Sequence, residues 1–194
     1  MIYQAKTNII NVILSSICYI FFYKFIINKP HQIMKKIIKL LSFLYLIQAA
    51  GAYAGDLSVG IGNFDYSDKN KSAIMVDMNY GFTENNMNSP IGKVIPIIGA
   101  FITEDSSAMA YAGAKIDYKL GMFVITPSFA PGFYREGDGK DLGHALEFKS
   151  QVNIGFNIGS GSVLSAGYSH ISNASLGDKN PGANTYSLNF LTQF

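Results

Sequence analysis

The sequence of 194 residues contains no tryptophan, and its one cysteine, Cys18, lies near the N-terminus. Disulfide bonds and thiolate metal sites are therefore excluded from the rest of the chain. After Ala54 the sequence also lacks any run of about 18 apolar residues, so no transmembrane helix is expected there. If that part of the chain crosses a membrane, it must cross as a closed barrel of strands.

Acidic residues are absent before Asp56, whereas six of the 15 lysines and arginines lie in the first 54 positions. From Gly55 onward the chain has nine basic and 13 acidic residues, a net charge of −4. The overall charge of +2 therefore belongs to the N-terminal segment. A nucleic-acid-binding protein needs a basic stripe, so this distribution argues against nucleic acid as a partner.

Residues 34–54 have the features of a secretory signal peptide. A basic start precedes a short apolar run over residues 37–47, and the segment ends in Ala-Tyr-Ala. The apolar run is too short to span a bilayer comfortably, which disfavours a membrane anchor. We predict cleavage before Gly55 and one exported domain over residues 55–194.

A second apolar stretch, from Ile9 to Ile27, lies upstream of the signal peptide. Because the signal peptide begins with its own methionine, we interpret residues 1–33 as an over-extended reading frame with Met34 as the true start. The alternative is a genuine N-terminal membrane helix, which would compete with export. N-terminal sequencing distinguishes them, since a chain that begins at Met1 would exclude cleavage.

Apolar and polar residues alternate along most of the exported domain, most clearly from His144 to Ile158. Successive side chains of a strand point to opposite faces of the sheet. Alternation over some fifteen residues exceeds the usual strand length of about five or six, whereas about nine to eleven residues suffice to cross a membrane at a tilt. The pattern therefore favours membrane strands.

Turn-forming residues divide the exported domain into eight such runs. We expect strands at roughly 56–66, 73–83, 94–104, 107–119, 122–135, 144–159, 161–173 and 184–194. An even number of strands with apolar-out, polar-in alternation is typical of a small outer-membrane barrel. The expected fold class is all-β, an eight-stranded antiparallel transmembrane β-barrel preceded by an N-terminal helical leader. The terminal Phe194 resembles the assembly signal of bacterial outer-membrane barrels, whereas a soluble lipocalin-like barrel would place its apolar residues inside.

Charged residues lie on the polar face of these runs and in the expected loops. We interpret the first set as an ion-pair network that fills the barrel interior: Asp77, Lys115, Asp117, Glu147 and Lys149. The loop cations could contact lipid phosphates, but charge in solvated loops accounts for them more simply. These are Lys69, Lys71, Arg135, Lys140 and Lys179.

A candidate catalytic pair, His170 and Ser172, lies at the end of the seventh run. The two side chains share a face, and that face is the apolar one that includes Tyr168. A serine hydroxyl becomes a useful nucleophile when an imidazole can take its proton. Polar groups on a lipid-facing wall are costly except near an interface, so this placement favours an enzyme with a lipid substrate.

Three asparagines and one backbone segment could complete the site. Asn184 should face lipid near His170, where its amide could hold the imidazole in position. Asn173, Asn180 and the backbone N–H groups near Ala174 could form an oxyanion hole. For Asn173 and Asn180 the alternative is turn chemistry alone.

The motif His170-Ile171-Ser172-Asn173-Ala174, followed by Asn180-Pro181-Gly182, is similar to the outer-membrane lipid A 3-O-deacylase (PagL) family. The resemblance covers the eight-stranded region. It implies hydrolysis, in the outer leaflet and without metal or cofactor, of the ester-linked 3-hydroxyacyl chain at position 3 of lipid A. It also implies Ser172 as nucleophile, His170 as general base, and Asn173, Ala174 and Asn180 at the oxyanion hole.

One position departs from the family pattern, which has glutamate where Asn184 stands. An amide cannot carry the negative charge that stabilises an imidazolium, and the equivalent change in a serine protease costs roughly 10⁴ in rate. Activity could be slow, another acid such as Asp178 could serve, or catalysis could be lost.

Two other functions stay open at this point, together with a homodimeric state. A non-catalytic barrel with a structural or adhesive role explains the fold equally well, but it does not explain the outward-facing His170 and Ser172. A phospholipid-directed esterase is the other. The mass spectrum of lipid A with and without the protein distinguishes all three.

Overall fold

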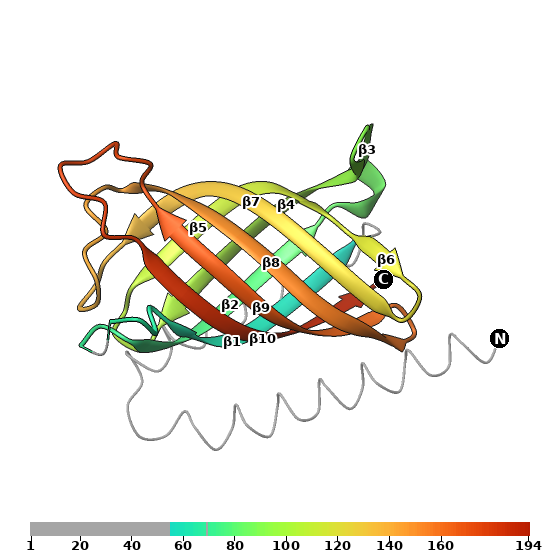
Figure 1. The fold of residues 1–194 in the computed structure, drawn as a ribbon, viewed down its shortest axis with the longest axis horizontal. Coiled ribbons are helices and arrows are strands. Elements are labelled where there is room, and N and C mark those ends of the chain that lie inside the picture. Colours follow the sequence, from blue (N-terminus) through green and yellow to red (C-terminus); the bar gives the residue numbers. More distant parts are fainter. Residues whose placement is uncertain (1–54, 69) are drawn as a thin grey trace, which may run out of the picture. The chain divides into compact units, whose positions relative to one another are not determined.

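The computed structural model describes residues 55–68 and 70–194, which form a closed antiparallel β-barrel (Figure 1). The upstream segment, the signal peptide and the helical leader that the sequence predicts within residues 1–54 lie outside the described residues. Within the described ranges, no helix is long and apolar enough to cross a membrane.

Eight strands form the barrel wall, and each overlaps one of the eight expected runs, with ends that differ by up to three residues. Their bounds are β1 (Asp56–Phe64), β2 (Ala73–Gly81), β4 (Gly92–Thr103), β5 (Ala108–Ile116), β7 (Phe123–Arg135), β8 (Leu146–Gly159), β9 (Ser162–Ser172) and β10 (Ala183–Gln193). Each wall strand pairs with its neighbours in the chain, and pairing of β1 with β10 closes the barrel. The predicted eight-stranded antiparallel barrel is confirmed.

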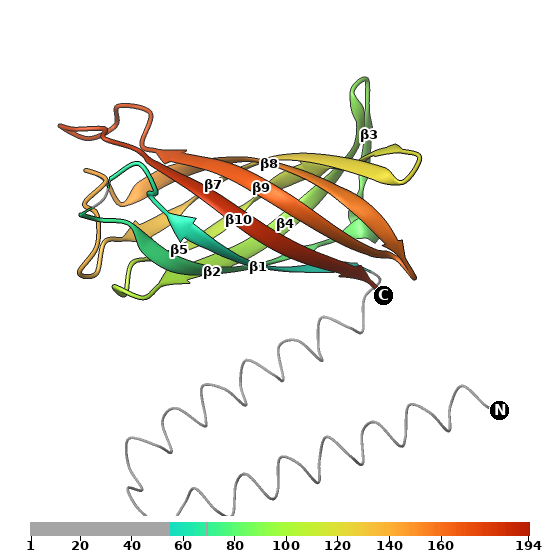
Figure 2. The ribbon, with the colours of Figure 1, turned by 60° about the horizontal axis from the view of Figure 1, so that its bottom comes forward.

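Three short elements are additions that the alternation did not predict. Strand β3 (Met87–Ser89) forms a hairpin with β4, and the 3₁₀ turn η1 (Thr83–Asn85) precedes it. Strand β6 (Tyr118–Leu120) pairs with β7 after a break in the sheet at Asp117. All three lie in the connections at the end of the barrel that carries the C-terminus (Figure 2).

Period-two alternation determines which side chains face outward. In β8, Ile154 and Phe156 are 56% and 46% exposed on the outer wall, whereas Glu147 and Lys149 are buried in the interior. Only helices and closed barrels satisfy all their backbone groups in lipid, so an apolar outer wall suits a membrane location.

The barrel interior has two parts of different character. Toward the ends of β1, β7 and β9 it is filled by an apolar cluster: Phe64, Met75, Ile97, Phe101, Met109, Tyr111, Ala130, Tyr134, Leu142, Ile171 and Ala183. The polar-in expectation therefore fails for this part. Both faces of β4 are apolar here, because Ile97 and Phe101 point inward while Ile98 and Ile102 point outward.

Charged pairs occupy the middle of the barrel interior and the end of the barrel that carries the C-terminus. Lys149 pairs with Asp77, which also accepts a 2.6 Å hydrogen bond from the Tyr111 hydroxyl. Lys115 Nζ lies 2.7 Å from Asp56 Oδ2 and 3.6 Å from Asp117 Oδ2. The expected ion-pair network is thus present.

Glu147 does not belong to that network. Its side chain is fully buried, and neither carboxylate oxygen has a hydrogen-bond partner among the described residues. The expectation that Glu147 takes part in an ion pair was therefore wrong.

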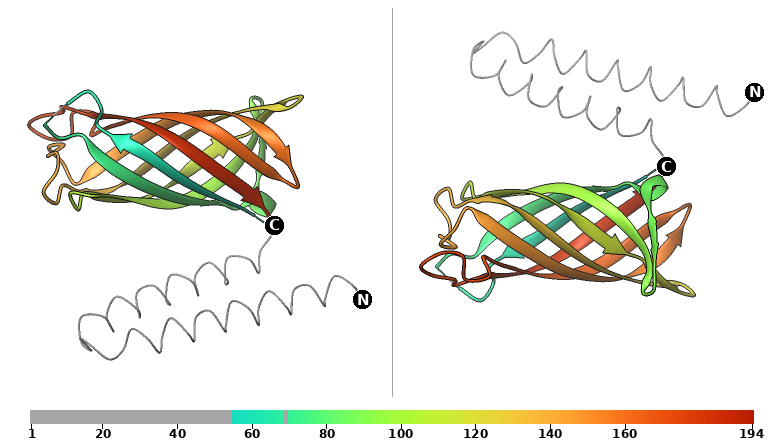
Figure 3. Two further views of the ribbon diagram at one scale, coloured as in Figure 1. Left: turned by 90° about the horizontal axis from the view of Figure 1, so that it is seen from below. Right: turned by 90° about the horizontal axis from the view of Figure 1, so that it is seen from above.

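The two ends of the barrel differ (Figure 3). Gly55 and Phe194 are joined by backbone hydrogen bonds at one end, where the turn at residues 160–161 also lies. At the other end lie three long connections, over residues 65–72, 136–145 and 173–182, whereas the end with Gly55 and Phe194 has one connection of similar length, over residues 82–91, and shorter ones over residues 117–122 and 160–161. Outer-membrane barrels have short periplasmic turns and longer external loops, so the end with most of the long loops is the external end.

Candidate active site

Strands β9 and β10 bring the predicted catalytic residues together at the external end of the outer wall. Asn184 lies directly opposite His170 in the register of the two strands. His170 is exposed, and Ser172 and Asn184 are partly exposed. Ile171, between His170 and Ser172, is buried in the interior. His170 and Ser172 therefore face outward, away from the barrel core.

A hydrogen bond to Asn184 orients the imidazole of His170. His170 Nδ1 lies 2.8 Å from Asn184 Oδ1. A carbonyl oxygen can only accept a hydrogen bond, so Nδ1 is the donor, and in the neutral imidazole Nε2 then carries the lone pair. This is the tautomer in which Nε2 can take a proton from a nearby hydroxyl.

Ser172 Oγ makes no hydrogen bond to His170 within the described part of the chain. Hydrogen bonds between catalytic groups commonly tighten only when the substrate is bound. The fold therefore places both side chains on the same face at the same end of β9. A proton transfer between the two side chains would require this contact to form when a substrate binds.

Asn173, the residue after Ser172, is fully buried and shapes the loop that follows. Its side-chain amide donates hydrogen bonds of 2.8 Å to the carbonyls of Leu142 and Lys179, and its Oδ1 accepts one of 2.9 Å from the Ser175 N–H. Its backbone N–H donates to Asn180 Oδ1 at 3.1 Å. All the donors of Asn173 are thus used within the protein, which leaves its side chain a structural role in the loop.

Two N–H groups beside Ser172 stay available. Ala174 and Ser175 adopt positive φ angles of 52° and 64°, a conformation that non-glycine residues keep only where the surroundings impose it. The Ala174 N–H has no hydrogen-bond partner among the described residues, and the Asn180 amide uses only its oxygen. These two groups are the available candidates for an oxyanion hole.

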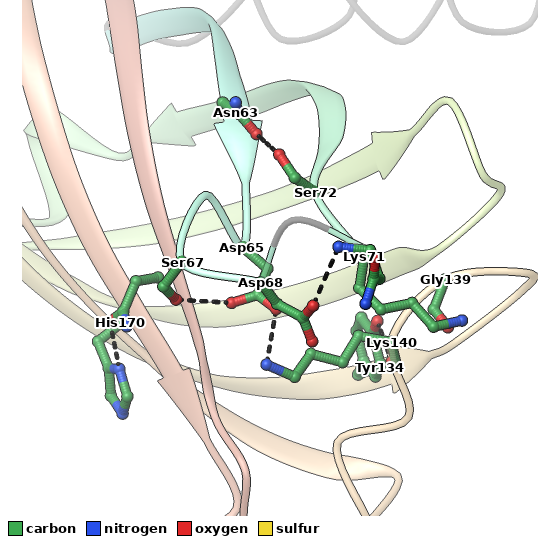
Figure 4. A network of polar contacts seen from close by, with 12 residues as sticks. Asn63, Asp65, Ser67, Asp68, Lys71, Ser72, Tyr134, Gly139, Lys140 and His170 are labelled. Carbon is green, nitrogen blue, oxygen red and sulfur yellow. Dashed lines mark hydrogen bonds and ion pairs between the residues drawn. The ribbon is translucent and has the colours of Figure 1, made fainter.

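The external loops bind one another (Figure 4). Lys140 Nζ lies 2.6 Å from Asp65 Oδ2, and Lys71 Nζ donates a 2.8 Å hydrogen bond to the Gly139 carbonyl. Lys179 Nζ lies 2.5 Å from Asp141 Oδ2, and this contact lowers the pKa of the Asp141 carboxyl. Three of the loop cations are therefore engaged in contacts between loops.

No carboxylate in the described part of the chain contacts His170, so the acid position is held by Asn184 alone. Asp178, the alternative acid, is exposed in the loop, and among the described residues no hydrogen bond or ion pair joins it to the imidazole. Among the described residues, no group of His, Cys, Asp and Glu side chains could hold a metal ion.

Sequence reasoning missed one contact of the site. The Tyr168 hydroxyl donates a 2.8 Å hydrogen bond to Asn184 Oδ1, the same atom that His170 contacts. In the sequence, Tyr168 is one more apolar-face residue of its run. The available signal was its position two residues before His170, which places both side chains on one face.

Comparison with known proteins identifies the family and the fold. A family model described as lipid A 3-O-deacylase (PagL) matches residues 57–193. The crystal structure of the outer membrane enzyme PagL is similar with a TM-score of 0.57 and 17% identity, covering 72% of this chain and 99% of that chain. A structure from the de novo design of transmembrane β-barrels gives 0.50 and 9%, covering 73% and 95%. The comparison with curated proteins gives no match.

Proposed function

The chain belongs to the lipid A 3-O-deacylase (PagL) family of outer-membrane β-barrel enzymes, and from this premise we propose that it hydrolyses the 3-hydroxyacyl ester of lipid A by a serine–histidine mechanism. One observation carries the mechanism. His170, oriented by Asn184 Oδ1 at 2.8 Å, shares an outward face with Ser172 at the external rim of the barrel.

In the first half of the reaction Ser172 Oγ attacks the ester carbonyl carbon while His170 Nε2 accepts the hydroxyl proton. The carbonyl oxygen becomes an oxyanion, which the Ala174 N–H and the Asn180 amide stabilise by hydrogen bonding. The bond between the acyl carbon and the sugar oxygen then breaks. The departing oxygen at position 3 of lipid A takes the proton from Nε2, and an acyl-serine remains.

In the second half a water molecule attacks the acyl-serine and gives its proton to His170 Nε2. Collapse of the second oxyanion releases the 3-hydroxy fatty acid, and the proton returns to Ser172 Oγ. Asn184 holds the imidazole throughout but offers no charge to the imidazolium. The rate should therefore be lower than it would be with a carboxylate at that position.

The location of the site favours a substrate that stays in the bilayer. His170 lies on the same face of β9 as Leu164 and Tyr168, which are 41% and 38% exposed on the apolar outer wall. The interior behind the site is filled by the apolar cluster. An ester of an outer-leaflet lipid can reach Ser172 by lateral movement, without leaving the membrane.

The test is the mass spectrum of lipid A from cells that carry the wild-type or the Ser172→Ala protein. We expect the wild type to remove one 3-hydroxyacyl mass and the variant to leave lipid A intact. Ser150→Ala is the matched control, because Ser150 is an exposed serine directly opposite His170 on β8. That control should deacylate normally.

Three other outcomes would contradict the proposal. Release of the 3-hydroxy acid by Ser172→Ala but not by Ser150→Ala would identify Ser150, on β8, as the nucleophile. An unchanged lipid A profile with altered phospholipids would mean that the substrate is a phospholipid. No change in either lipid would indicate a non-catalytic barrel.

A further inference from the structure

The amide of Asn184 accepts two hydrogen bonds at one oxygen. Tyr168 Oη and His170 Nδ1 each lie 2.8 Å from Asn184 Oδ1. Both donors are on β9 and share its outward face, and Asn184 faces them from β10. A carbonyl oxygen has two lone pairs, so the two donors together saturate it.

We propose that Tyr168 is a positioning residue of the deacylase reaction, which keeps the oxygen of the Asn184 amide turned toward His170. The inference rests on the proposed function for its catalytic consequence. It concerns a difference between this chain and its family, because a glutamate at the same position would present an oxygen in either orientation.

The orientation of a primary amide decides which imidazole tautomer forms. With Oδ1 toward His170, Nδ1 must be protonated, and Nε2 is free to act as a base. With the amide rotated by half a turn, its NH₂ group would donate to Nδ1 and move the proton to Nε2. An imidazole with the wrong tautomer cannot take the proton of a serine, which is how an acid-to-amide change damages a serine protease.

Tyr168 can bias this choice because a phenol donates a hydrogen bond more readily than it accepts one. Its hydroxyl therefore favours the amide oxygen over the amide NH₂ group. On a wall that faces lipid, few water molecules are available to replace that bond, so its loss is not easily compensated.

Neighbouring aromatic rings hold Tyr168 in place. Its ring packs against Tyr186 at 5.5 Å between centroids, and Tyr186 stacks on Tyr66 at 4.3 Å. The backbone N–H of Tyr66 donates a 3.1 Å hydrogen bond to the Asn184 carbonyl, so the main chain of Asn184 is fixed as well. Replacement of Tyr168 by phenylalanine should keep the ring packing and remove only the donor.

The first test reads the tautomer directly and requires no turnover. Nitrogen NMR of the histidine-labelled barrel should show His170 as the single Nδ1–H tautomer in the wild type and as a mixture in Tyr168→Phe. His144 is the internal reference, because it is the only other histidine after residue 54. An unchanged tautomer in Tyr168→Phe would overturn the proposal.

The second test compares kinetics in two backgrounds. Tyr168→Phe should lower kcat about tenfold with little change in KM, in line with the loss of one hydrogen bond. In the Asn184→Glu background the same change should cost no more than about twofold, because a carboxylate has no NH₂ group to misplace. Equal losses in both backgrounds would mean a merely structural role and would overturn the proposal.

These tests separate the inference from the proposed function. If neither the wild type nor Asn184→Glu releases a 3-hydroxy acid, the deacylase reaction fails, and the NMR measurement still decides whether Tyr168 controls the His170 tautomer.

Discussion

Gly182 lies against the imidazole of His170. A Cβ atom at residue 182 would be 2.9 Å from His170 Cε1 and 3.4 Å from Nε2. Gly182 also has a φ of +62°, which glycine adopts without steric cost. The glycine of the Asn-Pro-Gly segment therefore leaves room for the imidazole of the candidate base and also permits the backbone conformation of the loop.

We predict that Gly182→Ala displaces the His170 ring and lowers kcat/KM about 100-fold, since a displacement near 1 Å can have that effect. Gly121→Ala is the control, because Gly121 has a similar φ of +64° and no atom within 4 Å of the added Cβ. Initial rates of 3-hydroxy acid release, measured on barrels that circular dichroism shows to be folded, check the prediction. Equal activity of the two variants would show that the ring is not confined by Gly182.

Asn184→Glu should raise kcat, by about 10- to 100-fold, because a carboxylate stabilises the imidazolium that forms when His170 takes the Ser172 proton. Asn184→Gln separates charge from length, and it should not increase the rate. The measurement is the single-turnover rate of deacylation for the three proteins. A rate in Asn184→Glu no higher than that of the wild type would mean that charge at this position does not limit the reaction.

The wall of the barrel could be predicted from the sequence because the side chains of each strand alternate between the lipid and the interior. In β8, a one-residue slip would turn Glu147 and Lys149 into lipid and Phe156 into the interior, so burial specifies the register. The same rule placed His170 and Ser172 on the outer face. Alternation carries no such information where both faces are apolar, and for that reason the cluster around Phe101 was not foreseen.

Contacts between strands and loops were beyond sequence reasoning for a different reason. The bond from Tyr168 to Asn184 depends on the register between β9 and β10, which follows a loop over residues 173–182. The bond from Asn173 to the Leu142 carbonyl joins loops far apart in the chain. Neither distance can be obtained from the spacing of residues within one segment of the sequence. The contacts of Tyr168 and Asn173 could therefore be found only in the structure.

Asn173→Ala should loosen the loop that carries Ala174. The change leaves the carbonyls of Leu142 and Lys179 without their donor, and an unsatisfied buried group costs about 1–3 kcal/mol. We expect faster proteolytic cleavage within residues 173–182 and a parallel loss of deacylation. Lys179→Ala is the control, because it keeps the backbone carbonyl and removes only an ion pair between two exposed side chains, which contributes little to stability. Equal cleavage rates for the two variants would argue against Asn173 as the support of the loop.

Two buried carboxylates in the interior should respond in opposite ways to mutation. Asp77 is paired with Lys149, so Lys149→Met leaves a buried charge without a cation, which typically costs about 3–5 kcal/mol in the free energy of unfolding. Glu147 has no partner among the described residues, so Glu147→Gln replaces an unpaired ionisable group with a neutral amide of the same shape and should leave stability unchanged or raise it. Urea titration of the barrel in lipid vesicles measures both effects. A second change, Asp77→Leu added to Lys149→Met, should restore much of the lost stability, because the unpaired charge is then gone. If Glu147→Gln were as destabilising as Lys149→Met, Glu147 would have to be held by an interaction outside the described residues.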